Sequence, residues 1–323
     1  MTPDFPDKPL SADAQRRLAG ATDRSYRLHG DEEAGAELRR AAHGRIDAAL
    51  ERLRRDTRTD VATAVHDTRK DMKKLRSLLR LVRDGLGEQR YRAENDRYRD
   101  AARQLSPARE AEVNLATLAA LRKRYADEAP AAETLRRALE LEHERVAVEG
   151  DALDERVAQV TEAIAAGATD IDDWPLDGDD FDLVQAGIER AYRRGRRGLR
   201  RVRDDPTAEN VHDWRKRVKD LWYQLRLLQD AWPAVLKASA AEAHELADLL
   251  GDHHDLSVLV AKARDQAPDD PDTEMLAALG ERRQAELLDA ALQLGDRLYA
   301  EKPDQFTRRV QRYWRAWRPP NRR

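Results

Sequence analysis

Apolar residues recur at spacings of three and four along most of the chain, the pattern of helices that bury one face. Leu75, Leu78, Leu79 and Val82 form one such series. Runs of alternating apolar and polar residues, typical of half-buried strands, are nearly absent. The sequence therefore predicts an all-α fold. Helices are expected over residues 31–57, 60–84, 88–105, 110–127, 130–166, 181–203, 207–230, 233–250, 255–264, 273–299 and 303–318.

The chain also contains an internal repeat. Residues 65–83 read VHDTRKDMKKLRSLLRLVR and residues 211–229 read VHDWRKRVKDLWYQLRLLQ, with ten of nineteen positions identical. A weaker echo follows each copy, LSPAREAEVNLATL from Leu105 and LGDHHDLSVLVAKA from Leu250. The nearly constant offset predicts two repeats of roughly 145 residues each. We expect two bundles of the four-helix type, related by an internal pseudo-two-fold axis.

The repeats divide the chain into segments. Residues 1–30 show no clear pattern and are expected to form an N-terminal arm. One domain is expected over 31–319, with repeats at 31–166 and 181–318. The segment Ala166–Asp180, AGATDIDDWPLDGDD, is acidic and rich in turn-forming residues, so 167–180 is predicted to be the linker.

Basic residues form a stripe on each repeated helix. In the first copy they lie within about 60° of His66 at the pitch of an α-helix, opposite the apolar face: His66, Arg69, Lys70, Lys73 and Arg80. The second copy repeats them as His212, Arg215, Lys216, Lys219 and Arg226.

Each stripe position carries the same residue in both copies, but the positions beside the stripe differ. Lys74 corresponds to Asp220 and Asp71 to Arg217, as expected of freely solvated charges. Like charges one turn apart repel each other and destabilise a helix, so the stripes predict an external multivalent anion held by charge-assisted hydrogen bonds. The alternative is a solvated helix face whose charge is balanced by acids on neighbouring helices.

The composition narrows the function classes. Charged residues make up 37% of the chain and aromatics 5%, but the net charge is only −3, so a uniformly basic nucleic-acid binder is not favoured. There is no cysteine, which excludes disulfides and Cys-type metal sites. Neither a secretory signal nor a run of apolar residues long enough to span a membrane is evident, so we expect a cytoplasmic protein.

Two His-Asp pairs, His66–Asp67 and His212–Asp213, and the segment His253–His254–Asp255 raise the possibility of a metal-dependent phosphohydrolase. Arg and Lys follow each of the first two pairs on the same face, and fixed cations disfavour a divalent metal. We therefore predict no metal, no cofactor and no catalytic residue. The histidines are expected to donate hydrogen bonds to an anion.

A second basic cluster, AYRRGRRGLRRVR, spans Ala191–Arg203 and places Arg193 and Arg196 on one face. It is equally consistent with a solvated arginine-rich helix. Lys302, in the C-terminal segment, is expected within reach of a binding groove.

The two VHDxRKxxxK helices, followed by LGDHHDLSVL and LYAEKPDQF, resemble the conserved histidine α-helical domain (CHAD) family over residues 31–318. The resemblance implies two helical bundles with a basic groove or pore between them, inorganic polyphosphate as the ligand, and association with polyphosphate granules and their proteins. Some members are fused to a triphosphate-processing domain called CYTH. This chain lacks an ExExK motif and is expected to be a stand-alone member.

One loop departs from the family pattern. LSPARE at 105–110 stands where LGxxRD is expected, so Arg109 keeps the basic position while Glu110 replaces an aspartate. The predicted polyphosphate-binding residues are His66, Arg69, Lys70, Lys73, Arg80, Arg109, Arg193, Arg196, His212, Arg215, Lys216, Lys219, Arg226, His254 and Lys302. The alternatives are, in order, a scaffold for an acidic protein partner, a nucleic-acid binder and a phosphohydrolase.

Overall fold

The computed structural model describes residues 23–55, 61–105, 107–148, 150–178, 180–268 and 270–318. In these ranges the protein is all-α, as predicted, with twelve α-helices, one short 3-10 helix and no strand. The helices are α2 (Ala34–Arg55), α3 (Val61–Leu81), α4 (Arg83–Leu86), α5 (Glu88–Gln104), α6 (Pro107–Arg124), α7 (Glu133–Val148), α8 (Gly150–Asp172), α9 (Asp182–Asp204), α10 (Ala208–Leu227), η2 (Gln229–Ala231), α11 (Pro233–Gln266), α12 (Pro271–Leu298) and α13 (Pro303–Trp317). Among the described helices, none combines the length and apolar character needed to cross a bilayer.

Several predicted helix boundaries differ from those of the structure. Residues 233–250 and 255–264 belong to one helix, α11, because apolar residues continue through the break, and buried Leu250 and Leu256 flank it. Within the segment 130–166, the structure describes α7 up to Val148 and α8 from Gly150 onward. The segment predicted as the linker begins inside α8, which continues to Asp172.

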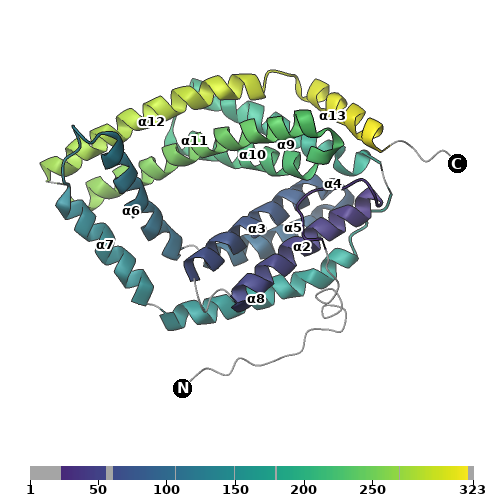
Figure 1. Ribbon diagram of the computed structural model, residues 1–323, viewed down its shortest axis with the longest axis horizontal. Helices are drawn as coiled ribbons and strands as arrows, with labels where there is room; N and C mark the ends of the chain where they lie inside the picture. Colours follow the sequence, from purple (N-terminus) through teal and green to yellow (C-terminus); the bar gives the residue numbers. More distant parts are fainter. Residues whose placement is uncertain are drawn as a thin grey trace.

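The helices that carry the repeat sequences lie at the centre of the fold. α3 packs with α2 and α5, and α8 closes this group, while α10 packs between α9 and α11 (Figure 1). α3 and α10 also contact each other. A large core cluster joins residues from both halves of the chain, including Leu75 of α3 and Leu221 of α10. The apolar faces of both repeated helices are thus buried, as predicted.

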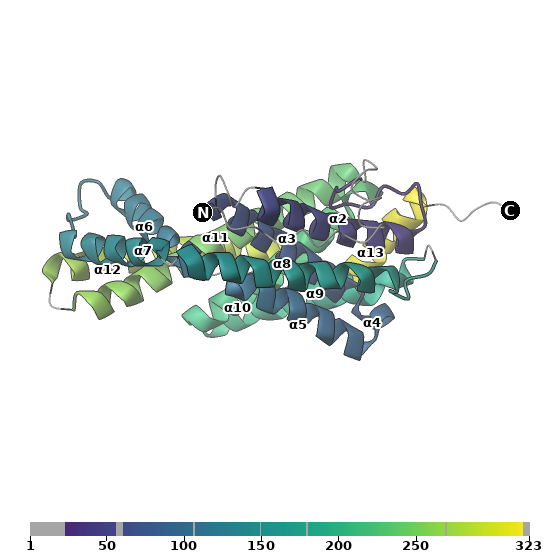
Figure 2. The same cartoon turned by 90° about the horizontal axis from the view of Figure 1, so that it is seen from below.

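A second, smaller core lies at the other end of the molecule. Leu118 and Leu121 of α6 and Leu135 of α7 pack there against Leu259 of α11 and Leu276 of α12. This part extends beyond the main body in both views (Figures 1 and 2). Because α11 and α12 run through both cores, the first half of the chain contributes α6 and α7 to a core that it shares with the second half.

Asp71 is not the freely solvated charge that the repeat comparison indicated. Its side chain is 1% exposed and pairs with Arg45 (2.9 Å), Lys74 (3.0 Å) and Arg52. Burial acts to raise the pKa of Asp71, but Lys74, Arg45 and Arg52 outweigh it and hold the pKa below its usual value. Asp71 thereby joins α2 to the side of α3 away from the stripe.

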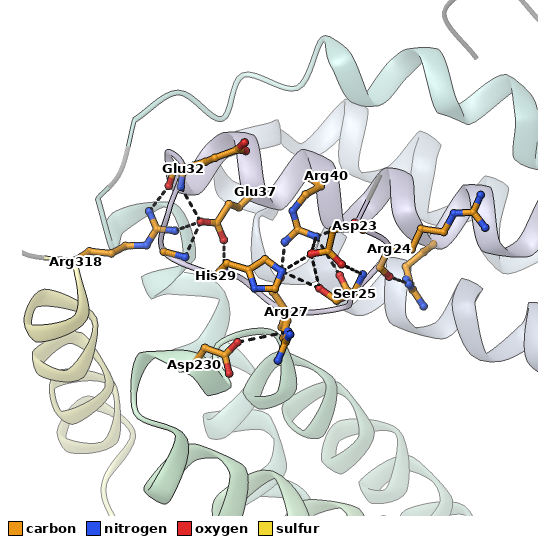
Figure 3. Close-up of polar contacts among 12 residues, drawn as sticks. Asp23, Arg24, Ser25, Arg27, His29, Glu32, Glu37, Arg40, Asp230 and Arg318 are labelled. Atoms are coloured by element: carbon orange, nitrogen blue, oxygen red, sulfur yellow. Dashed lines mark hydrogen bonds and ion pairs between the residues drawn. The ribbon is translucent and has the colours of Figure 1, made fainter. Parts of the chain in front are cut away.

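The start of α2 and the end of α13 are joined by a buried ion pair. Arg318 Nη2 lies 2.5 Å from Glu37 Oε1, and the two side chains are 3% and 1% exposed (Figure 3). Glu37 also accepts backbone N–H bonds from His29 and Gly30. The guanidinium of Arg318 lies over the ring of Trp317, 4.8 Å from its centroid. The last described helix is thus fixed to the first.

Candidate anion-binding site

Basic side chains from two helices of the second half gather in one place, which we call the α10 cluster: His212, Arg215, Lys216, Lys219 and His254. The rings of His212 on α10 and His254 on α11 lie in contact at an interplanar angle of 32°, with centroids 4.1 Å apart. α11 is continuous through the LGDHHD segment, which brings His254 onto α10. The structure therefore joins the stripe to its echo segment, and all five residues were predicted as ligands.

The electrostatics of the α10 cluster show that these groups repel one another. Burial, followed by repulsion from His254, Lys216 and Arg215, lowers the pKa of His212 to about 4. Burial and the neighbouring cations likewise lower the pKa of His254 to about 4. Burial, with Arg215 next, lowers the pKa of Lys219 to about 8, although Asp248 and Asp255 oppose this shift. Burial is the largest cause of all three shifts, and repulsion from the neighbouring cations adds to it.

Two polar atoms of the cluster are buried without a hydrogen-bond partner among the described residues, Arg215 Nε and His212 Nδ1. Buried polar atoms in proteins are nearly always paired, so such atoms call for an explanation. Gly251 of α11 leaves room for the Arg215 side chain, because a Cβ at Gly251 would lie 3.0 Å from Arg215 Nη2. The arrangement fits an anion that accepts hydrogen bonds from the cluster.

The His-Asp pairs have the same local geometry in both halves. Asp213 pairs with Lys216 at 2.7 Å, and Asp67 pairs with Lys70 at 3.1 Å, each within one helical turn. The aspartate of each pair is therefore engaged by the lysine of the stripe. Among the described residues, no group of three or more metal-binding side chains is found.

The first-half stripe lies on α3. Lys70 and Lys73 are exposed, while His66 and Arg69 are half-buried. Arg69 Nη1 donates to the backbone oxygen of Ala102 on α5 (3.2 Å). The side chain of Arg109, the predicted echo residue of this half, lies outside what the structure describes.

Four other predicted ligands have protein partners of their own, and a fifth, Lys302, is exposed. Arg80 pairs with Asp220 at 3.0 Å, and Arg193 pairs with Glu189 at 2.6 Å. Arg196 donates to the oxygen of Tyr299 at the end of α12 (3.2 Å). Arg226 lies over the ring of Trp222. Lys302 is exposed at the N-cap of α13. The structure groups none of these with the α10 cluster.

A pocket of about 380 Å³ opens beside the cluster, between α6, α11 and α12. Its polar lining includes Glu112, Asp252, Asp255, Arg124 and Arg283. Burial, with repulsion from Asp255 and Asp248, raises the pKa of Asp252. Asp255 is common to the pocket and to the surroundings of Lys219, so the basic cluster borders on an acidic region.

The comparison with curated proteins finds no match. The family model described as the CHAD domain matches residues 37–264, more than half of the chain and including both repeated helices and the LGDHHD segment. The protein belongs to the CHAD domain family.

Proposed function

We propose that this CHAD domain binds inorganic polyphosphate as a binding module without catalytic activity of its own. The observation that carries the proposal is the α10 cluster, in which three basic side chains and two imidazoles gather, and in which Arg215 Nε and His212 Nδ1 are buried without a hydrogen-bond partner among the described residues. A chain of linked phosphates offers closely spaced anionic oxygens, the acceptors that Arg and Lys bind most strongly. Family membership is consistent with a polyphosphate-related function.

We further propose that the first-half stripe binds the same polymer across a pseudo-two-fold axis between α3 and α10. The contact between these helices supports this arrangement. Ser77 Oγ donates to the oxygen of Asp220 (3.0 Å), and Gln224 Nε2 donates to the oxygen of Ser77 (3.4 Å). The corresponding parts of the two copies thus meet. In the cell, the domain would accompany polyphosphate, including polyphosphate granules and their proteins.

The proposal is tested by titrating the protein with long-chain polyphosphate at two salt concentrations. Neutralising phosphates releases condensed counterions, so affinity should fall steeply with salt, by analogy with DNA. We expect polyphosphate to displace single-stranded nucleic acid and an acidic polypeptide, and no phosphate to be released with or without chelator. Equal competition by nucleic acid, preference for the polypeptide, or chelator-sensitive phosphate release would each favour one of the alternative functions.

The depressed pKa of Lys219 predicts a pH dependence of this binding. In the free protein Lys219 loses its proton near pH 8, whereas a bound polyanion favours the protonated form. Affinity for long-chain polyphosphate should therefore fall as the pH rises from 7 to 9. A Lys219→Arg variant, whose guanidinium does not titrate in this range, should show a flatter profile. Identical slopes for the two proteins would show that Lys219 does not bind the polymer.

A further inference from the structure

Six arginines from four helices gather on another face of the molecule, where the two halves meet. We call them the junction arginines: Arg76 and Arg80 of α3, Arg83 of α4, Arg190 and Arg194 of α9, and Arg217 of α10. On α10, Arg217 lies about 140° around the helix from His212 at 100° per residue. The junction is therefore a different surface from the α10 cluster.

The backbone brings these arginines together. α9 approaches the end of α3 so closely that a Cβ on Gly187 would lie 1.9 Å from the backbone oxygen of Leu81. Only glycine permits this approach. Arg190 and Arg194 lie three and seven residues after Gly187, on the same side of α9. The close crossing thus places them beside α3 and α4.

Carboxylates balance only part of this charge. Asp220 lies 3.0 Å from Arg80 and 3.5 Å from Arg217. Asp84 accepts two hydrogen bonds from Arg190. Glu88 pairs with Arg83. Three carboxylates thus face six arginines, and Asp96 and Asp100 of neighbouring α5 already pair with Arg99.

Arg194 is the centre of the unbalanced charge. Its side chain is exposed, and no hydrogen bond or ion pair is found for it among the described residues. Burial of part of the side chain, then repulsion from Arg217 and Arg190, lowers the pKa of Arg194, with Asp220 opposing. Burial and then Arg80 lower the pKa of Arg76 to about 10. Guanidinium groups held this close to one another favour a shared anion, and their planar donor sets match phosphate.

We propose that the junction arginines form a second phosphate-binding surface, which takes phosphate groups of a polyphosphate chain. The proposal rests on the proposed function and extends it to five arginines outside the stripes, beside Arg80 of the first-half stripe. The same chemistry would bind a short, free oligophosphate. The experiment therefore uses two probes, long-chain polyphosphate and tripolyphosphate.

Binding of both probes is measured by calorimetry at low salt for four proteins. They are the wild type, a junction variant (Arg194→Gln with Arg217→Gln), a cluster variant (Lys216→Gln with Lys219→Gln) and a control (Arg137→Gln with Arg297→Gln). The control removes the same charge from exposed arginines on α7 and α12.

We expect the junction variant to bind long-chain polyphosphate about tenfold more weakly than the control, with a salt slope smaller by about two. If the junction variant also loses a set of tripolyphosphate-binding sites, the junction arginines bind oligophosphates on their own, without a long chain. If tripolyphosphate binding is unchanged, the junction acts only within a long chain. Either result supports the proposal that the junction arginines bind phosphate groups of polyphosphate.

The inference is overturned if the junction variant binds long-chain polyphosphate and tripolyphosphate as tightly as the control does. If the cluster variant loses binding in that case, the proposed function stands and only the second surface is rejected. If the wild type binds neither probe, the proposed function fails as well. Because Arg217 pairs with Asp220, the single variant Arg194→Gln repeats the measurement without disturbing any ion pair found in the described structure.

Discussion

A variant with Lys216→Glu and Lys219→Glu is expected to bind long-chain polyphosphate at least 100-fold more weakly than the wild type at low salt. The two changes reverse two charges in the α10 cluster, where these lysines lie beside Arg215 and the two histidines. Hydrogen bonds to charged groups contribute about 1.5–3 kcal/mol each, so losing two corresponds to a factor of roughly 100 or more. Repulsion between the new carboxylates and the polyanion adds to this loss.

The matched control is Lys123→Glu with Lys237→Glu, which makes the same change in net charge at exposed lysines of α6 and α11. This control should lose affinity by no more than a few-fold, because its charges act through screened solvent. Circular dichroism shows whether the helices are retained. If both double variants weaken binding equally, the protein attracts polyphosphate only through its overall charge, and the cluster is not the binding site.

The same change on α3, Lys70→Glu with Lys73→Glu, tests the first-half stripe. These lysines are exposed, so the variant should fold normally. If the polymer contacts both stripes, the α3 variant should also bind polyphosphate more weakly, and combining the two double variants should weaken binding further. If only the α10 cluster binds, the α3 variant should resemble the control.

The sequence predicted the fold class and the identity of the α10 cluster, because both depend on local spacing. Helical periodicity marks the buried face, and comparison of the two copies isolates the positions where the basic residue is the same. His254 could be included only through its place in the echo segment. Its ring contact with His212 depends on α11 continuing through Gly251, where the sequence indicated a break between helices.

The partners of individual arginines could not be predicted in this way. Arg80 and Arg226 occupy equivalent stripe positions, but Arg80 pairs with Asp220 while Arg226 lies over Trp222. The difference arises because the residues beside the stripe differ between the copies: Asp220 reaches Arg80 from the facing helix, whereas Trp222 lies one turn before Arg226 on α10 itself. A contact between distant helices, such as that of Arg80 with Asp220, leaves no periodic signal in the sequence.

Five of the six junction arginines were missed for the same reason, since only Arg80 was among the predicted ligands. The only signal was the density of arginine between 190 and 203, where the prediction selected Arg193 and Arg196. The structure pairs both of these with groups of the protein itself. Arg190 and Arg194 instead lie toward α3 and α4, a direction set by the close approach at Gly187.

Replacing Glu37 with alanine is expected to lower the free energy of unfolding by about 3–5 kcal/mol, because removing one partner of a buried ion pair leaves the other charge buried without compensation. Arg318 is that charge, 3% exposed and enclosed by Trp314 and Trp317. Glu37 also holds the backbone N–H groups of His29 and Gly30, which would lose their acceptor. Urea unfolding followed by circular dichroism measures the change.

The control is Glu245→Ala, which removes an exposed glutamate from α11 and should change the free energy of unfolding by no more than about 0.5 kcal/mol. The double variant Glu37→Ala with Arg318→Ala separates the ion pair from the other contacts. Because the unpaired charge is then gone, it should be less destabilised than the sum of the two single variants. A Glu37→Ala protein within 1 kcal/mol of the wild type would show that the contact between α2 and α13 does not depend on this pair. Neither Glu37 nor Arg318 lies in the α10 cluster. The Glu37→Ala protein should therefore bind polyphosphate with wild-type affinity under conditions in which it remains folded.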